Sequence, residues 1–222
     1  MVSRISHFAG CKPALTMLCM SRFLCSLLAA CALATCGFAQ VSTWQIDPSH
    51  SAAQFTVRHL LISNVKGAFT KVSGVAQYDP VDLSKTAVEA TIETASVDTR
   101  VEGRDNDLRS ANFFDVAKYP TITFKSKRAE AAGNGKVKLI GDLTIHGVTR
   151  EVVLDVTDIT EPLKDQRGNL HVGTSATTKI KRQDFGLTYN RAVEGAAVVG
   201  DDVQITIDAE LIKPAATNTA AK

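Results

Sequence analysis

Apolar and polar residues alternate strictly along most of the chain between residues 44 and 213. In the last run, Ile205 and Ile207 fall on one face while Thr206 and Asp208 fall on the other. A period of two residues is typical of a β-strand with one buried face. Many such strands with one shared apolar face predict an antiparallel barrel. The same sorting recurs in residues 54–57, 88–93 and 151–156.

Residues that favour turns separate these runs and divide the segment into eight to ten predicted strands. Asp79-Pro80, Gly133-Asn134-Gly135 and His146-Gly147 are examples, because glycine, proline, asparagine and aspartate suit tight turns. The predicted strands lie near residues 43–47, 52–59, 65–78, 86–97, 120–131, 136–145, 148–160, 169–180 and 201–213.

Two stretches break the period of two. Residues 104–114 place Leu108, Ala111 and Phe114 at spacings of three after Asp105, which could serve as an N-cap, so a helix is predicted there. Residues 181–190 predict a shorter turn or helix.

The first 39 residues read as a cleavable secretory signal peptide. They hold all five cysteines and an apolar stretch at residues 23–34 that follows Arg22. This stretch is too short for a membrane span. Gly37 and Ala39 supply the small residues expected at positions minus three and minus one of a cleavage site just before Gln40. The remaining chain, which has no cysteine, is then expected to fold without disulfides.

Two alternatives concern this leader. Leu28-Ala29-Ala30-Cys31 resembles the site at which bacterial lipoproteins are cut and acylated, although the cleavage site at Ala39 fits better. A leader that begins at Met1 would also be unusually long, which makes Met17 or Met20 a candidate start.

The balance of charged residues bears on which classes of partner the exported chain is expected to bind. The whole chain has 25 basic and 23 acidic residues, and removing Arg4, Lys12 and Arg22 with the leader leaves 22 basic residues against 23 acidic ones. This balance gives no electrostatic reason to expect nucleic acid or an anionic membrane surface as a partner. Residues 40–213 are expected to form one domain, and the Ala/Thr-rich tail 214–222 is expected to be disordered.

The interior of an eight-stranded barrel is either filled by side chains or wide enough for one small ligand. The inward candidates include many valines, isoleucines and alanines and few large aromatic residues. Composition alone leaves both a solid core and a cavity open.

A few polar residues are candidates for chemistry. His50 and Ser51, oriented by Arg104 and Asp105, could act as a nucleophilic pair on an apolar substrate. We expect instead that these groups satisfy one another's hydrogen bonds in an apolar barrel, so that an Asp105→Ala variant unfolds. The histidines show no metal-binding spacing, and no metal is expected.

Several blocks of sequence follow one another in a recognisable order. They are WQIDPSHS (44–51) with FTVRH (55–59) and VKGAF (65–69), then SVDT (96–99) with Arg104-Asp105, NFFD (112–115) with YPTITFKS (119–126), GDLTIHGVT (141–149) and RQDFG (182–186). In this order the blocks resemble the YceI-like polyisoprenoid-binding family over roughly residues 44–213.

The resemblance implies an all-β fold, an eight-stranded antiparallel lipocalin-like barrel with one or two short helical excursions. It also implies export to the periplasm, no enzymatic activity, no cofactor, and an apolar pocket for an isoprenoid quinone or polyprenyl lipid. Whether the chain forms a homodimer is left open, and any contact with a membrane is expected to be transient. Ala52-Ala53 are smaller than the apolar residue usual in the family, which leaves the width of the pocket open.

Within this reading, fourteen apolar residues are expected to contact the lipid and three polar residues to lie near its head group. Phe113, Phe114 and Phe185 are the candidates for a gate or plug at one end of the barrel. The polar residues are His50, Arg104 and Asp105. The apolar ones are Phe55, Val57, Phe69, Ile92, Phe113, Phe114, Ile122, Phe124, Leu143, Ile145, Leu154, Phe185, Ile205 and Ile207.

Overall fold

The computed structural model describes residues 42–79, 81–190, 192–193 and 196–215. The predicted signal peptide, with its alternatives at Cys31, Met17 and Met20, lies outside the described residues, and so does most of the predicted tail.

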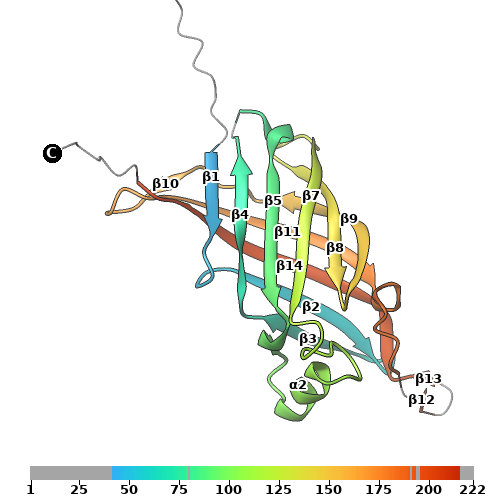
Figure 1. Ribbon diagram of the computed structural model, residues 1–222. Helices are drawn as coiled ribbons and strands as arrows, with labels where there is room; N and C mark the ends of the chain where they lie inside the picture. The colour runs from blue at the N-terminus through green and yellow to red at the C-terminus, as the bar shows by residue number, and fades with distance from the viewer. Residues whose placement is uncertain (1–41, 80, 191, 194–195, 216–222) are drawn as a thin grey trace, which may run out of the picture. The chain divides into compact units, whose positions relative to one another are not determined.

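Eight antiparallel strands close into a barrel (Figure 1). Around the ring they are β11 (Leu170–Lys181), β9 (Val148–Thr157), β8 (Val137–Ile145), β7 (Thr121–Ala131), β5 (Ala87–Glu93), β4 (Val72–Tyr78), β1 (Ser42–Ile46) and β14 (Val199–Lys213). The ring closes where β14 pairs with β11 along almost its whole length, from Leu170 opposite Lys213 to Lys181 opposite Asp202. The predicted fold class is therefore confirmed.

The long strand β14 shares its other edge between two partners. Its C-terminal part pairs with β1, and its N-terminal part pairs with β2 (Ala52–His59). Strand β3 (Ser63–Phe69) pairs with β2, and β6 (Val97–Asp98) pairs with β3, so the wall continues beyond the ring of eight. Two short pairings complete the described strands: β10 (Leu163–Lys164) on β11, and β12 (Ala192–Val193) with β13 (Ala196–Ala197).

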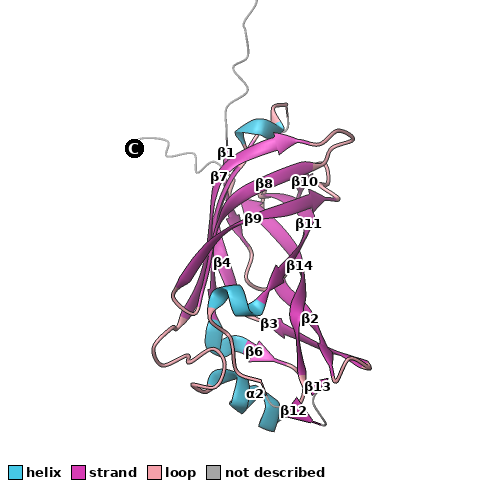
Figure 2. Ribbon diagram, turned by 90° about the vertical axis from the view of Figure 1, so that its right-hand side faces the viewer, coloured by secondary structure: helices cyan, strands magenta, loops and turns pink. Residues whose placement is uncertain are grey.

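The α-helix α2 (Glu102–Arg109) lies at one end of the barrel (Figure 2). It covers only part of the predicted range 104–114, and Asp105 is not its N-cap. Val101 holds that position, and the carboxylate of Asp105 accepts a hydrogen bond from Thr99 instead. Three 3₁₀ turns accompany it: η1 (Leu83–Lys85), η2 (Thr94–Ser96) and η3 (Arg182–Phe185).

None of the helices in the described ranges is long and apolar enough to cross a membrane.

Three predicted strands are longer than the observed ones. Residues 65–78 form β3 and β4, with a bend at Thr70-Lys71. Residues 86–97 form a strand only as far as Glu93, and residues 148–160 only as far as Thr157. The bend is visible in the burial pattern, because Phe69 and Val72 are both buried although they are three residues apart. An odd spacing between two inward residues cannot fit one continuous strand.

The turn between β8 and β9 is the two-residue hairpin predicted at His146-Gly147. Both residues have positive φ, 51° and 74°. Glycine suits the second position because its φ is positive, and a Cβ there would also lie 2.6 Å from the ring of Tyr119. This hairpin fixes the register that brings Leu143 and Ile145 to the inner face of the barrel.

Candidate functional site

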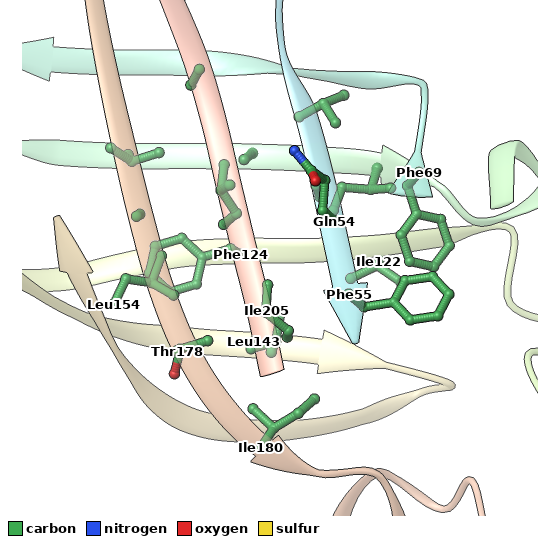
Figure 3. Close-up of a pocket in the computed structure, with 18 of the residues that line it drawn as sticks. Gln54, Phe55, Phe69, Ile122, Phe124, Leu143, Leu154, Thr178, Ile180 and Ile205 are labelled. Atoms are coloured by element: carbon green, nitrogen blue, oxygen red, sulfur yellow. The ribbon is translucent and has the colours of Figure 1, made fainter. Parts of the chain in front are cut away.

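The inner faces of the strands enclose a cavity with a volume of about 260 Å³. Figure 3 shows aromatic and branched aliphatic side chains from several strands gathered around this space, among them Phe124, Leu154 and Ile205. The barrel is therefore hollow, which decides between the two interiors that composition left open.

Thirteen of the fourteen predicted lipid-contacting residues line this cavity. The period of two found the eleven that lie in strands, because alternate residues of a strand share a face. Phe113 and Phe114 lie outside the strands and were chosen as gate candidates. Whether a lipid contacts these thirteen residues stays a prediction. The thirteen are Phe55, Val57, Phe69, Ile92, Phe113, Phe114, Ile122, Phe124, Leu143, Ile145, Leu154, Ile205 and Ile207.

The fourteenth residue, Phe185, does not line the cavity. Its side chain is 1% exposed and belongs to the packed core. The turn η3 ends at Gly186, whose φ of 77° reverses the chain, and the ring of Phe185 is buried inside this turn region. Phe185 is therefore not part of the cavity wall, and a gate or plug at this residue stays a prediction.

Strand β11 supplies a stretch of the wall that sequence reasoning missed. Its inward residues alternate along the strand, but two threonines among them hid the apolar face. The hydroxyl of Thr174 donates to the carbonyl of Thr157 at 3.0 Å, which satisfies its polar atom within the protein. The period alone could have found these residues, which are Val172, Thr174, Ala176, Thr178 and Ile180.

Arg182 is the only arginine or lysine in the cavity wall within the described ranges, and it was also missed. It is 4% exposed, and burial lowers its pKa, although the charge of Asp201 opposes this effect. Its guanidinium donates to the carbonyls of Leu187, Tyr189, Val199 and Gly200. Arg182 therefore ties the segment after η3 to the start of β14.

Two aromatic contacts lie at the end of the cavity near α2. The ring of Phe114 packs edge-on against Phe69, with centroids 5.4 Å apart, and the ring of Phe113 packs edge-on against Tyr189 at 5.2 Å. Phe113 also lines a second pocket on the outside, with Gly103 and Asp107 of α2. Of the three predicted gate residues, Phe113 is thus the one between the cavity and the surface.

Arg104 and Asp105 both bind Thr99. The carboxylate of Asp105 accepts from the backbone N–H of Thr99 at 2.9 Å and from its hydroxyl at 2.5 Å. Arg104 donates to the hydroxyl oxygen and the carbonyl of the same residue. These contacts fasten α2 to the end of β6, which is a structural role.

We expect Asp105→Ala to destabilise the protein by roughly 1–3 kcal/mol, because a buried N–H and hydroxyl of Thr99 lose their acceptor. Chemical denaturation measures this change. Glu102→Ala, an exposed change in the same helix, is the control and should have a much smaller effect. A fully stable Asp105→Ala variant that loses an activity would instead support the enzymatic alternative.

His50 and Ser51 have other partners. Nδ1 of His50 lies 2.7 Å from Oδ2 of Asp47, and the hydroxyl of Ser51 accepts from the backbone N–H of Glu210. Within the described ranges, no hydrogen bond or ion pair joins them to Arg104 or Asp105. The structure does not assemble the proposed nucleophilic set, and these polar residues do not line the cavity.

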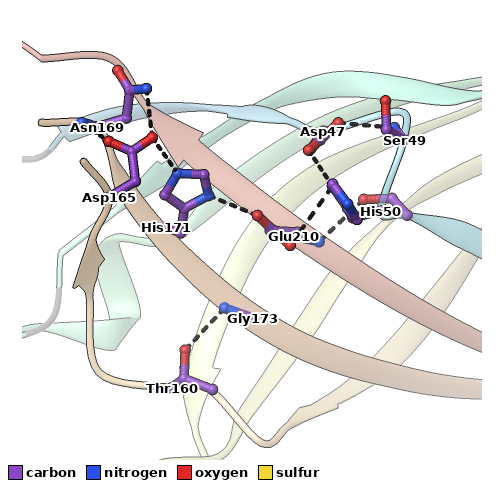
Figure 4. A network of polar contacts seen from close by, with 10 residues as sticks. Asp47, Ser49, His50, Thr160, Asp165, Asn169, His171, Gly173 and Glu210 are labelled. Carbon is purple, nitrogen blue, oxygen red and sulfur yellow. Dashed lines mark hydrogen bonds and ion pairs between the residues drawn. The ribbon is translucent and has the colours of Figure 1, made fainter. Parts of the chain in front are cut away.

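His50 belongs instead to a polar network on the outer side of the barrel (Figure 4). Its centre is His171, whose Nδ1 lies 2.6 Å from Glu210 and whose Nε2 lies 3.2 Å from Asp165. Carboxylates only accept hydrogen bonds, so both bonds require a doubly protonated imidazolium. Hydrogen bonds with Glu210 and then Asp165 accordingly raise the pKa of His171. Burial of Asp165 acts to raise the pKa of its carboxyl group. Hydrogen bonds from Asn169 and His171 outweigh burial and lower this pKa to about 2.

The network predicts a pH dependence of stability. A histidine whose pKa is raised in the folded state stabilises the protein fully below its ordinary value of 6.5, and this contribution is lost as the pH rises through the folded pKa. We expect the free energy of unfolding to fall with rising pH above neutrality, and to fall less in His171→Gln. Urea titrations across this range measure both; parallel profiles of the two proteins would contradict the assignment.

One group of residues in the described part of the chain could hold a metal ion. The ligand atoms of Asp47, His50 and Glu210 all lie within 4.8 Å of one another. The same atoms already have hydrogen-bond partners, since Asp47 accepts from His50 and from the backbone N–H of Ser49. The expectation of no metal stays a prediction.

Comparison with known proteins gives consistent matches. The model of the YceI-like domain family matches residues 44–211. A UPF0312 protein of Staphylococcus aureus is 33% identical over 171 residues, which cover 77% of this chain and 97% of that protein. A UPF0312 protein of Vibrio cholerae is 37% identical over 139 residues, which cover 63% of this chain and 73% of that protein.

Solved structures are similar too. The YCEI protein of Campylobacter jejuni is 38% identical, with a TM-score of 0.60 over 70% of this chain and 89% of that one. BcnA of Burkholderia cenocepacia has a TM-score of 0.63 and 24% identity over 74% of this chain and 98% of that one. A polyisoprenoid binding domain from Saccharophagus degradans, implicated in plant cell wall breakdown, has a TM-score of 0.57 and 18% identity over 79% of this chain and 100% of that one.

Proposed function

The chain belongs to the YceI-like domain family, and on this premise we propose that it is a periplasmic carrier that holds an isoprenoid lipid inside its barrel. The cargo would be an isoprenoid quinone or a polyprenyl chain. The observation that carries the proposal is the hollow barrel, whose cavity is lined almost entirely by apolar side chains.

The chemistry of an isoprenoid tail suits such a wall. The tail has almost no hydrogen-bonding groups, so it needs a space free of water and no polar partners along its length. At about 0.3 kcal/mol per non-hydrogen atom, two enclosed isoprene units, or about ten carbons, contribute about 3 kcal/mol. That is about a 100-fold gain in affinity without a single polar contact.

One solved structure with this fold supports the same class of ligand. The domain from Saccharophagus degradans that shares this fold is described as polyisoprenoid binding. Its low identity supports the type of barrel, and the ligand class is carried to this chain as part of the proposal. The periplasmic location rests on the predicted signal peptide at residues 1–39.

A chain-length series tests the proposal. Protein stripped of lipid would be titrated with geraniol, farnesol and geranylgeraniol, which add one isoprene unit at a time. We expect affinity to rise by about tenfold with each added unit until the cavity is full. Isothermal titration or displacement of a fluorescent apolar probe gives the dissociation constants. Equal, weak binding of all three alcohols would contradict enclosure of the tail.

A further inference from the structure

The hairpin between β2 and β3 carries exposed apolar residues at its tip. Leu61 is 63% exposed and Ile62 is 78% exposed. Leu60 and Leu61 both have positive φ, 50° and 63°, a conformation that is uncommon for residues other than glycine. The guanidinium of Arg58 donates to the carbonyl of Leu61 at 2.7 Å and so holds this turn. The tip is thus a fixed apolar projection.

The same hairpin is cationic, although the net charge of the exported chain is close to zero. It carries Arg58, His59 and Lys66, and no aspartate or glutamate occurs between residues 51 and 78. Arg58 and Lys66 are exposed, and neither takes part in an ion pair among the described residues. Apolar residues next to unpaired cations are complementary to a lipid surface with anionic head groups.

Backbone contacts place this tip beside the end of the cavity. The N–H of Leu60 donates to the carbonyl of Val198 at 2.9 Å. Val198 and Val199 line the outer pocket together with Phe113 and Tyr189. Phe113 and Val199 also belong to the cavity wall. Both residues are therefore shared by the outer pocket next to the tip and the apolar interior.

We propose that the β2–β3 tip docks the protein onto an anionic lipid bilayer. Leu61 and Ile62 enter the interface, while Arg58 and Lys66 contact the anionic head groups. Docking in this way directs the Phe113 end of the cavity toward the membrane, where isoprenoid lipids are found. The role of docking in loading the cavity with lipid rests on the proposed carrier function, whereas the docking itself does not.

Sedimentation with lipid vesicles tests the docking. We expect the full exported chain to bind vesicles of phosphatidylcholine with phosphatidylglycerol, and to bind vesicles of phosphatidylcholine alone more weakly. The double variant Leu61→Ser/Ile62→Ser should lose at least about tenfold of its partition into the mixed vesicles. Lys66→Gln should weaken binding to the mixed vesicles only.

The matched control removes exposed apolar residues elsewhere. Val81 is 81% exposed next to η1, and Leu163 is 73% exposed in β10, which lies far from the tip in Figure 1. We expect Val81→Ser/Leu163→Ser to bind vesicles like the unaltered protein. Equal binding by the tip variant and the unaltered protein, or an equal loss in both double variants, would overturn the proposal.

A second measurement separates docking from lipid uptake. Farnesol supplied in solution on cyclodextrin should be taken up equally by the tip variant and the unaltered protein, whereas transfer of a quinone from vesicles should be slower in the tip variant. If the unaltered protein takes up no farnesol, the carrier function is wrong, and the vesicle experiment still tests the docking. Equal transfer rates from vesicles in both proteins would contradict a role of the tip in loading.

Discussion

Replacing Leu154 by aspartate is expected to abolish uptake of isoprenoids, with an affinity loss of about 1000-fold or more. Leu154 is 7% exposed and lines the cavity on β9. An ionised carboxylate in an apolar site without a partner costs roughly 4 kcal/mol or more, and a tail in the cavity would have to strip the remaining water from it. Equilibrium binding of geranylgeraniol measures the loss.

The neighbouring residue supplies the control. Val153 is 42% exposed on the opposite face of the same strand, so Val153→Asp adds the same charge where water reaches it, and uptake should be unchanged. If Leu154→Asp does not fold, Ala176→Phe is the second variant. It fills the cavity with an apolar ring, so it should also prevent uptake of geranylgeraniol. A folded Ala176→Phe or Leu154→Asp variant that binds geranylgeraniol normally would show that the lipid lies elsewhere.

Phe185→Ala should lower the free energy of unfolding by about 3–5 kcal/mol, which is more than the effect expected of Asp105→Ala. The side chain is 1% exposed and packs in the core, so its removal leaves a void there. Urea denaturation measures the change. Because Phe185 does not line the cavity, the fraction that remains folded should bind geranylgeraniol with unchanged affinity.

Two further variants sharpen this prediction. Phe185→Leu should lose much less stability, because it keeps most of the buried volume. Phe113→Ala should change the rate of lipid uptake, because its ring lies between the cavity and the outer pocket, but it should cost little stability. A small effect of Phe185→Ala on unfolding, together with lost uptake, would support Phe185 as a gate.

Much of this fold could be predicted because each barrel strand has one solvent-exposed face and one buried, apolar face. The alternation fixed the facing of β5, β9 and β14, and the His146-Gly147 turn was recognised from its residue types. The break between β3 and β4 was missed, although the two consecutive polar residues Thr70 and Lys71 interrupt the period of two. The family expected from the ordered sequence blocks was confirmed.

The site was predicted less completely, for physical reasons. Thr174 and Thr178 look polar in the sequence, but the hydroxyl of Thr174 is satisfied by a neighbouring carbonyl, so it can stand in an apolar wall. Arg182 can be buried because its guanidinium donates to carbonyls from residues 187–200. The residues next to Arg182 in the sequence do not indicate these partners, so its burial could not be predicted. Asp105 was expected to share hydrogen bonds with His50, Ser51 and Arg104, but its partner is Thr99, which is known only from the fold.

Native mass spectrometry of the protein recovered from a periplasmic fraction tests the carrier function most directly. The protein would be measured intact and then extracted with organic solvent to identify whatever it carried. We expect a stoichiometric adduct with the mass of an isoprenoid quinone or a polyprenyl chain, and we expect the Ala176→Phe variant to lose it. A bare protein that also takes up no added isoprenoid would contradict the carrier function.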